Sequence, residues 1–410
     1  MPDHRDAAAT ALLLGGARLA DGRTVDVRLT GERVEAVGTP GSLPATAPGV
    51  QRLDLTGYLL LPAPAEPHAH HDTALTSGCP GPPPEGPDQL RRRIIEASLL
   101  QLSHGATAQR SQIRIGDILG LRALEAAQAA RRALLGLAEL QPVAAPRLLT
   151  GRAGADNRAQ LADAAQLGGT ALGGCPDLDP DPAGYADIVL SIADAQGCAI
   201  DLHTDADDPA RFTRLVTAAG ACRTAVTLGP CAGLSLLPPD TAARAADQLA
   251  AAGVAVSCLP QSPCAALPAP TRPSRPPTPP VRTLLAAGVT VAAGSGAVRD
   301  AGNPVGRGDP LEAAYLLAVR GACDTTGAYR AISSAARAVL GLPKVRIEPG
   351  FPAELLAVRG ENLPGALSLA YSRLVIHRGR VVARTSAVRE YCGSPAVPLT
   401  ELPRQPAPRS

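Results

Sequence analysis

The sequence is poor in aromatic side chains and carries almost no net charge. Its 410 residues include no tryptophan, two phenylalanines and six tyrosines, and the formal net charge is +2. So few aromatic rings leave little surface on which bases or sugars could stack. Without a basic stripe, the electrostatic footprint of a nucleic-acid-binding protein is also missing. We therefore expect no nucleic-acid partner.

The sequence also lacks a long apolar run and any paired-cysteine motif. No stretch approaches the ~20 apolar residues that a membrane helix needs, and residues 1–16 are too acidic for a secretory leader. The nine cysteines are scattered without a C-x-x-C spacing, at positions 79, 175, 198, 222, 231, 258, 264, 323 and 392. Such a set is typical of reduced thiols. We expect a cytoplasmic protein with no membrane partner.

Strand-like patterns occur at both ends of the chain, on either side of a long mixed region. Short alternating runs separated by turn residues lie within 8–60 and again within 353–383. They predict a small β-sandwich built from both termini. The expected domains are 1–61 for its N-terminal part, 62–345 for the mixed region, 346–393 for its C-terminal part, and a Pro-rich disordered tail at 394–410.

The middle region alternates apolar strand candidates with helical stretches. The strand candidates are 59–63, 106–110, 134–140, 169–173, 197–202, 225–229, 253–258 and 288–293. This alternation fits a closed parallel barrel, although periodicity alone fits a doubly wound sheet equally well. Two Pro-rich stretches, 80–87 and 268–280, would lie over the mouth of a barrel.

Residues 66–72, Glu-Pro-His-Ala-His-His-Asp, follow an apolar run at 58–62. Strand alternation places His68 and His70 on one face, where two imidazoles can share a metal ion. His71 would point to the opposite face and is expected to be exposed in a loop. A bare H-x-H is more often a pair of polar residues in a loop, so the context must decide.

That context resembles a known family. Residues 61–70 resemble the first strand of the amidohydrolase superfamily, in its cytosine-deaminase-like branch. Segments resembling its fourth strand, fifth strand and the region after its eighth follow in order, at 173–176, 201–205 and 303–312. Several ordered motifs are far more specific than one. The resemblance implies a (β/α)8 TIM barrel of the metal-dependent hydrolase type and hydrolysis of C–N bonds.

Part of the family's metal site is present. The resemblance implies His68 and His70 on the first strand, and His203 on the fifth, as ligands of one divalent metal ion, zinc or iron. Three histidines and a water can complete a tetrahedral zinc site. The same histidines could instead be remnants held by packing, in a protein without metal.

Three other family positions carry inert residues. Ala206 stands where the proton-shuttling glutamate belongs, Pro230 where a strand-six histidine belongs, and Gly296 where the strand-eight aspartate belongs. None has a side chain that can bind a proton or a metal ion. Losing the proton shuttle alone typically slows such a reaction ~10²–10⁴-fold. None of the three family positions therefore keeps a catalytic group.

The remaining candidates surround this incomplete site. Gln141 is kept at the expected end of strand three, where the branch has a substrate-contacting glutamine. Gln112 and Arg114 stand where the branch tends to have His and Asp, and are candidate substrate anchors. Cys231 could replace a lost ligand, or be a small apolar filler. Asp207 and Asp208 are expected to be solvated or to cap a helix.

These observations support three hypotheses. The first is a degenerate amidohydrolase whose hydrolysis is lost or strongly reduced. It would bind a small molecule in the barrel mouth, and would form a homo-oligomer or a hetero-oligomer with an active relative. The second is an active hydrolase or deaminase with a three-His metal site, aided by proton transfer through the substrate. The third is a barrel reused for non-hydrolytic chemistry.

Overall fold

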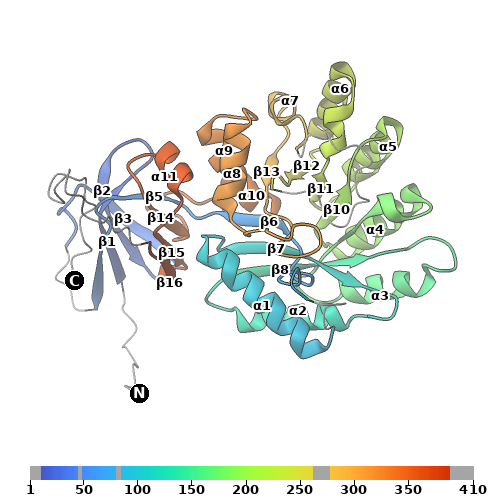
Figure 1. The fold of residues 1–410 in the computed structure, drawn as a ribbon, viewed down its shortest axis with the longest axis horizontal. Helices are drawn as coiled ribbons and strands as arrows, with labels where there is room; N and C mark the ends of the chain where they lie inside the picture. The colour runs from blue at the N-terminus through green and yellow to red at the C-terminus, as the bar shows by residue number, and fades with distance from the viewer. Residues whose placement is uncertain (1–10, 45–48, 80–84, 262–277, 388–410) are drawn as a thin grey trace, which may run out of the picture.

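The computed structural model describes residues 11–44, 49–79, 85–261 and 278–387, which form two parts lying side by side (Figure 1). One part is a β-sheet unit that contains both ends of the described chain. The other is a ring of parallel strands surrounded by helices. This architecture confirms the predicted (β/α)8 barrel with a β-sandwich from both termini.

The sheet unit interleaves strands from the two ends of the sequence. Its strands run in the order β16-β15-β14-β5-β1-β2-β3, and β4 pairs with β1. The strands are β1 (Ala11–Arg18), β2 (Thr24–Thr30), β3 (Arg33–Gly38), β4 (Val50–Asp54), β5 (Tyr58–Pro62), β14 (Leu355–Arg359), β15 (Arg373–His377) and β16 (Arg380–Thr385). The antiparallel pairing of β5 with β14 joins the two ends of the chain.

The barrel strands pair in sequence order, each parallel to the next. They are β6 (Ala65–Ala69), β7 (Ala108–Ile115), β8 (Glu139–Pro146), β9 (Ala171–Gly174), β10 (Ile200–Thr204), β11 (Val226–Pro230), β12 (Ala255–Cys258) and β13 (Val291–Ala293). The ring closes between β13 and β6 through one bridge, Ala69 with Gly296. Parallel strands put their carboxyl ends at one mouth, where such barrels carry their sites.

Helices surround the ring and follow most of the barrel strands. They are α1 (Pro87–Ser103), α2 (Arg122–Ala133), α3 (Ala155–Ala165), α4 (Pro182–Gln196), α5 (Pro209–Gly220), α6 (Pro239–Ala251), α7 (Val281–Ala286), α8 (Pro310–Val319), α9 (Thr325–Ile332), α10 (Ser334–Val339) and α11 (Leu363–Leu369), with short 3-10 turns η1 (Pro176–Leu178) and η2 (Ala232–Leu236). Within the described part of the chain, none of them is both long and apolar enough to cross a membrane.

The prediction for the first barrel strand was wrong. The apolar run at 59–63 belongs to β5 of the sheet unit, and the barrel begins with β6. The run is apolar on both faces because β5 lies between two cores. Leu59 and Leu61 pack in the core shared with the barrel, whereas Leu60 packs in the core of the sheet unit.

The prediction for the third strand was displaced along the chain. Residues 134–138 cap α2 and form the turn after it. The side chains of Leu134 and Ala138 are buried there. The strand itself is β8, whose two prolines weaken its sequence signal. Most of the Pro-rich stretches at 80–87 and 268–280, and the whole tail at 394–410, lie outside the described residues.

A buried ion pair joins the sheet unit to the barrel. The guanidinium of Arg373 on β15 donates to both carboxylate oxygens of Asp309, at 2.8 and 2.6 Å, and to the carbonyl of His104 at 2.7 Å. The Arg373 and Asp309 side chains are only 4% and 8% exposed. Asp309 also accepts a hydrogen bond from the Leu311 amide at 2.9 Å and so caps α8.

We predict that Arg373→Met destabilises the protein by about 3–5 kcal/mol, because it leaves the buried Asp309 carboxylate without its cationic partner. The unfolding free energy should be measured by urea titration. The matched control is Arg378→Met. Its side chain is 46% exposed and lies 3.6 Å from Glu32, so its loss should cost under about 1 kcal/mol. Equal effects of the two substitutions would contradict this role for the buried pair.

Candidate functional site

Three histidines converge at the carboxyl ends of β6 and β10. His68 lies on β6, His70 directly after it, and His203 on β10. The Nε2 atom of His203 lies 2.8 Å from that of His68 and 3.3 Å from that of His70. One ligand atom from each residue lies within 4.8 Å of the others, and all three side chains are buried. The structure therefore brings the three predicted ligands together around one point.

The donor atoms of this cluster suit one divalent metal ion. Zinc binds imidazole nitrogens at ~2.0–2.1 Å, and three such bonds to one ion hold the nitrogens at roughly the separations seen here. A carboxylate supports one ring from behind, because Asp201 Oδ1 lies 3.4 Å from His68 Nδ1. A carboxylate at Nδ1 fixes the tautomer that leaves Nε2 free as a ligand.

Asp201 is itself held by a buried arginine. Its second carboxylate oxygen lies 3.7 Å from the guanidinium of Arg110 on β7, and both side chains are buried. Burial acts to raise the pKa of Asp201, but the attraction of His68 and Arg110 outweighs it and the pKa is lowered. Sequence reasoning missed Asp201 as a supporting group. Its position two residues before His203, on the same strand face, is the signal that could have found it.

The barrel closes where the segment after β13 meets β6, and this junction, the seam, lies directly beside these ligands. The buried carboxylate of Glu66 on β6 accepts hydrogen bonds from the Ser295 amide at 2.8 Å and the Ser295 hydroxyl at 2.5 Å. Its other oxygen accepts from the His68 amide at 3.1 Å. Burial raises the pKa of Glu66 to about 7. One side chain thus joins the two edges of the seam where the strand ladder is reduced to a bridge.

His71 is not exposed, contrary to the prediction. Its ring is fully buried against α1, with Nε2 2.8 Å from Gln101 Oε1 and Nδ1 3.3 Å from Ser98 Oγ. Burial lowers its pKa to about 4. The amide nitrogen of Gln101 donates to the Ser295 hydroxyl at 2.9 Å, which extends the network to the seam. The strand alternation continues through His71, and the face opposite the metal ligands is covered by a helix.

The three family positions with inert residues differ in their surroundings. Gly296 has a left-handed φ of +67°, and its amide donates to the His68 carbonyl at 3.1 Å. A Cβ at this position would lie 3.1 Å from the Leu259 side chain. Pro230 is the last residue of β11 and is buried. Ala206 is buried just beyond β10 with a φ of +58°.

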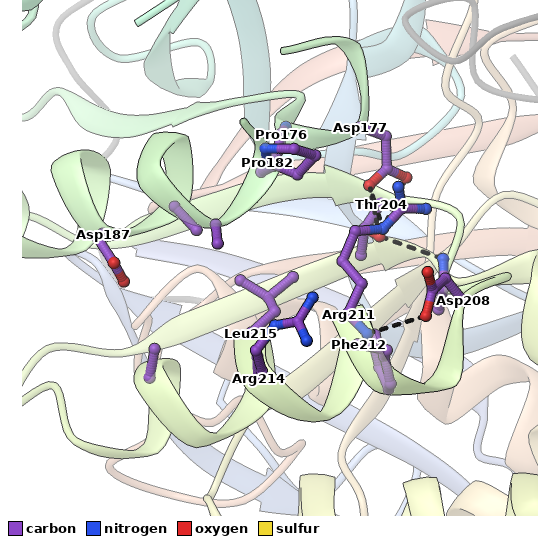
Figure 2. Close-up of a pocket in the computed structure, with 14 residues that line it drawn as sticks. Pro176, Asp177, Pro182, Asp187, Thr204, Asp208, Arg211, Phe212, Arg214 and Leu215 are labelled. Atoms are coloured by element: carbon purple, nitrogen blue, oxygen red, sulfur yellow. Dashed lines mark hydrogen bonds and ion pairs between the residues drawn. The ribbon is translucent and has the colours of Figure 1, made fainter. Parts of the chain in front are cut away.

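Ala206 lines a small cleft between α4 and α5. This cleft of about 150 Å³ is polar at one end, where Asp177 accepts a hydrogen bond from the Thr204 hydroxyl at 3.2 Å (Figure 2). Asp177 also accepts from the Asp205 amide at 2.9 Å. Arg211 reaches the same carboxylate from α5, at 3.8 Å. A longer side chain at position 206 would therefore extend towards this ion pair.

The three predicted substrate-binding residues occupy different environments. Gln141 is the third residue of β8 rather than at its end, because the strand begins later than predicted, and its Oε1 accepts from Arg110 Nε at 2.7 Å. The Arg114 side chain is nearly half exposed, and its Nε atom lies 2.9 Å from Asp72 Oδ2. Gln112 is 2% exposed, and neither of its amide atoms has a hydrogen-bond partner among the described residues.

The other candidates have structural roles. Cys231 lies outside the histidine group, is packed in the core, and burial raises the pKa of its thiol, which disfavours a metal-binding thiolate. Asp208 caps α5 through the Ala210 and Arg211 amides, as expected. Asp207 is exposed and pairs with Arg211 at 2.9 Å.

We predict that Asp201→Asn weakens zinc binding about 10–100-fold, because it removes the charge that orients His68. Zinc affinity should be measured by competition with a chromophoric chelator. The control is Asp177→Asn, which makes the same change in a partly buried carboxylate whose hydrogen bonds go to Thr204 and Asp205 rather than to a ligand. Unchanged zinc affinity in a natively folded Asp201→Asn protein would contradict the orienting role.

Comparison with known proteins shows the family of the chain. Residues 120–383 match the model of the amidohydrolase family. A pterin deaminase from Rhizobium rhizogenes is 32% identical over 242 residues, which cover 55% of this chain and 54% of that protein. The aligned region thus spans about half of the length of that curated relative.

Solved structures extend the likeness over nearly the whole chain. N-isopropylammelide isopropylaminohydrolase from Burkholderia multivorans is 26% identical, with a TM-score of 0.79, covering 92% of this chain and 100% of that one. 5-Methylcytosine deaminase from Klebsiella pneumoniae is 20% identical, with a TM-score of 0.78, covering 94% and 100%. At that identity the second likeness shows the fold alone.

Proposed function

Because this chain belongs to the amidohydrolase family, we propose that it binds one divalent metal ion and a small cyclic molecule, with hydrolysis of C–N bonds lost or strongly reduced. One observation carries the proposal. The three histidines converge, whereas three other family positions carry inert residues. Ala206 stands at the position of the proton shuttle, Pro230 at that of a histidine that polarises the water or the substrate, and Gly296 at that of a metal-ligating aspartate. Three metal ligands are kept, and the proton shuttle and two further metal-site groups are missing.

The metal would be held by His68, His70 and His203, through their Nε2 atoms. Zinc and iron both accept imidazole ligands, and three neutral imidazoles leave the full positive charge of the ion in place. Such an ion, when bound, lowers the pKa of a coordinated water towards neutrality. The protein's part is to fix the three rings, and Asp201 and the Glu66 seam support them.

Hydrolysis also needs a group that takes a proton from water and gives it to the leaving nitrogen. Two buried carboxylates beside the ligands already have other partners. Asp201 lies between His68 and Arg110, and Glu66 accepts two hydrogen bonds from Ser295 across the seam and one from the His68 amide on its own strand. Neither is free to move between water and a leaving group, so the loss at position 206 is not compensated from this side.

A second candidate is an active hydrolase that uses the three-His centre. It is favoured by the convergence of the three rings and by the carboxylate behind His68. Its proton would have to travel through the substrate itself. The similarity to a pterin deaminase supports a nitrogen heterocycle as the ligand class under either candidate.

We also propose the setting in which the protein acts. The seven cysteines of the described chain are all free thiols, which supports a location in the cytoplasm. A loss of hydrolysis is consistent with a partner role, as a homo-oligomer or with an active relative. The ligand would enter at the barrel mouth.

We predict that zinc-loaded wild-type protein releases little or no ammonia from cytosine or pterin. Restoring one position, by Ala206→Glu, Pro230→His or Gly296→Asp, should change little, because groups that act as a unit are non-additive. The triple variant should exceed the sum of the single variants. Ammonia release should be followed with a coupled assay, with zinc content measured in parallel.

Two controls sharpen this experiment. Adding Leu259→Ala to the triple variant removes the side chain that a Cβ at position 296 would meet, and should increase any recovered activity. His68→Ala tests the second candidate. Robust turnover by the wild type that His68→Ala abolishes would overturn the proposed loss of hydrolysis and establish the three-His hydrolase.

A further inference from the structure

We propose that Gln112 determines ligand specificity, by pairing with a planar cyclic molecule that presents an N–H and a C=O side by side, as a lactam does. The inference rests on the proposed function, because it names the class of molecule bound beside the histidine cluster. It depends on the position of Gln112 in the barrel, on its buried unpaired amide and on a second unpaired group that faces the barrel interior.

Strand alternation directs Gln112 into the barrel. On β7, the side chain of Gln109 donates to the Ser98 carbonyl of α1, and Ser111 accepts from the His71 amide. These odd positions face the helix layer. The even position Arg110 reaches inward to Asp201, so Gln112 faces inward one step nearer the mouth.

The pairing of β6 with β7 then places Gln112 at the same height along the barrel as His70. Ala69 is the register partner of Ser111, so the next residues along the two strands, His70 and Gln112, are neighbours on the inner face. A ligand held by Gln112 would therefore lie beside the exposed side of the histidine cluster. His70 is the most accessible of the three ligands, at 8% exposure.

The side-chain amide of Gln112 lowers the stability of the fold, because it is buried without hydrogen bonds to the described residues. It is 2% exposed, and neither its oxygen nor its nitrogen has a partner among the described residues. Each buried unsatisfied donor or acceptor disfavours the folded state. An apolar side chain of similar size would remove both penalties. A side chain kept against stability, beside a metal-ligating cluster, points to a ligand that supplies the missing partners.

A second unpaired group faces the same interior from β12. The Ser257 hydroxyl is fully buried and has no hydrogen-bond partner in the described chain. Val256 and Cys258 pack into the outer core, so Ser257 faces inward. Gly229 lies between Ser257 and His203, because it pairs with His203 and a Cβ on it would meet Ser257. A Cβ at Gly229 would lie 2.3 Å from the Ser257 carbonyl oxygen, so the glycine allows β12 to approach β11 closely at this level.

The chemistry of a primary amide then selects the ligand. Gln offers one acceptor and one donor side by side, and is uncharged. A lactam edge offers the complementary donor and acceptor, so two parallel hydrogen bonds can form. A carboxylate ligand would face the Gln oxygen, and an amidinium would face its N–H₂ group. The hydroxyl of Ser257 can donate or accept, and gives a second contact on the far side of the ring.

The test compares 2-pyridone, which carries the lactam edge, with 1-methyl-2-pyridone, which lacks the N–H. Binding to the zinc-loaded full chain should be measured by calorimetry, with zinc content determined for every variant. Wild-type protein should bind 2-pyridone at least ~10-fold more tightly, since one hydrogen bond in a buried site discriminates strongly. Gln112→Met should abolish that preference, and Ser257→Ala should weaken both ligands while keeping it.

The shape-matched variant Gln112→Glu separates pairing from packing. It should lose 2-pyridone and gain affinity for 2-aminopyridine, whose protonated form presents two donors. Gln112→Met should also raise the thermal midpoint by about 1–3 °C, because it removes a buried unsatisfied amide. A lowered midpoint together with an unchanged preference for 2-pyridone would overturn the inference.

These results are separable from the proposed loss of hydrolysis. Ammonia release by the wild type would overturn that loss and leave the 2-pyridone preference, which is an equilibrium ratio, intact. Conversely, equal binding of the two pyridones by a zinc-loaded, inactive wild type would overturn the role of Gln112 alone.

Discussion

The attachment of β6 to its two neighbours is the constraint on which the rest of this site depends. On one side β6 has a parallel ladder with β7, interrupted between Glu66 and Ala69. On the other side the ring closes through a single bridge and the carboxylate of Glu66. His68 and His70 lie on and directly after this strand, so their positions depend on a buried side chain more than on a regular sheet edge.

This constraint separates residues that support the metal ligands from the three family positions that carry inert residues. The groups that hold the metal ligands in place are interlocked, because Glu66, Ser295, Gln101 and His71 form one hydrogen-bonded chain. Removing any of them leaves a buried polar atom unpaired. Positions 206, 230 and 296 are outside that chain. Inert residues there do not interrupt this hydrogen-bonded chain.

The interior of the barrel combines satisfied and unsatisfied polar groups. In the deeper part of the ring, Arg110 donates a hydrogen bond to Gln141 at 2.7 Å and forms a 3.7 Å ion pair with Asp201. Nearer the mouth, Gln112 and Ser257 have no partners among the described residues. A protein under pressure for stability alone would replace such groups with apolar ones. Their presence beside the histidine cluster supports the proposed ligand at the barrel mouth.

The sequence by itself determined the family, the barrel and the three histidines, because ordered motifs and the alternation along a strand are local properties. Alternation also put His71 on the opposite face, but only the packing of α1 decided that this face is buried. The assignment of 59–63 to the barrel failed for a related reason. An apolar run shows that a strand is buried, and the tertiary structure decides which cores cover it. The unpaired state of Gln112 is likewise invisible in sequence, because it depends on what every neighbouring strand does not supply.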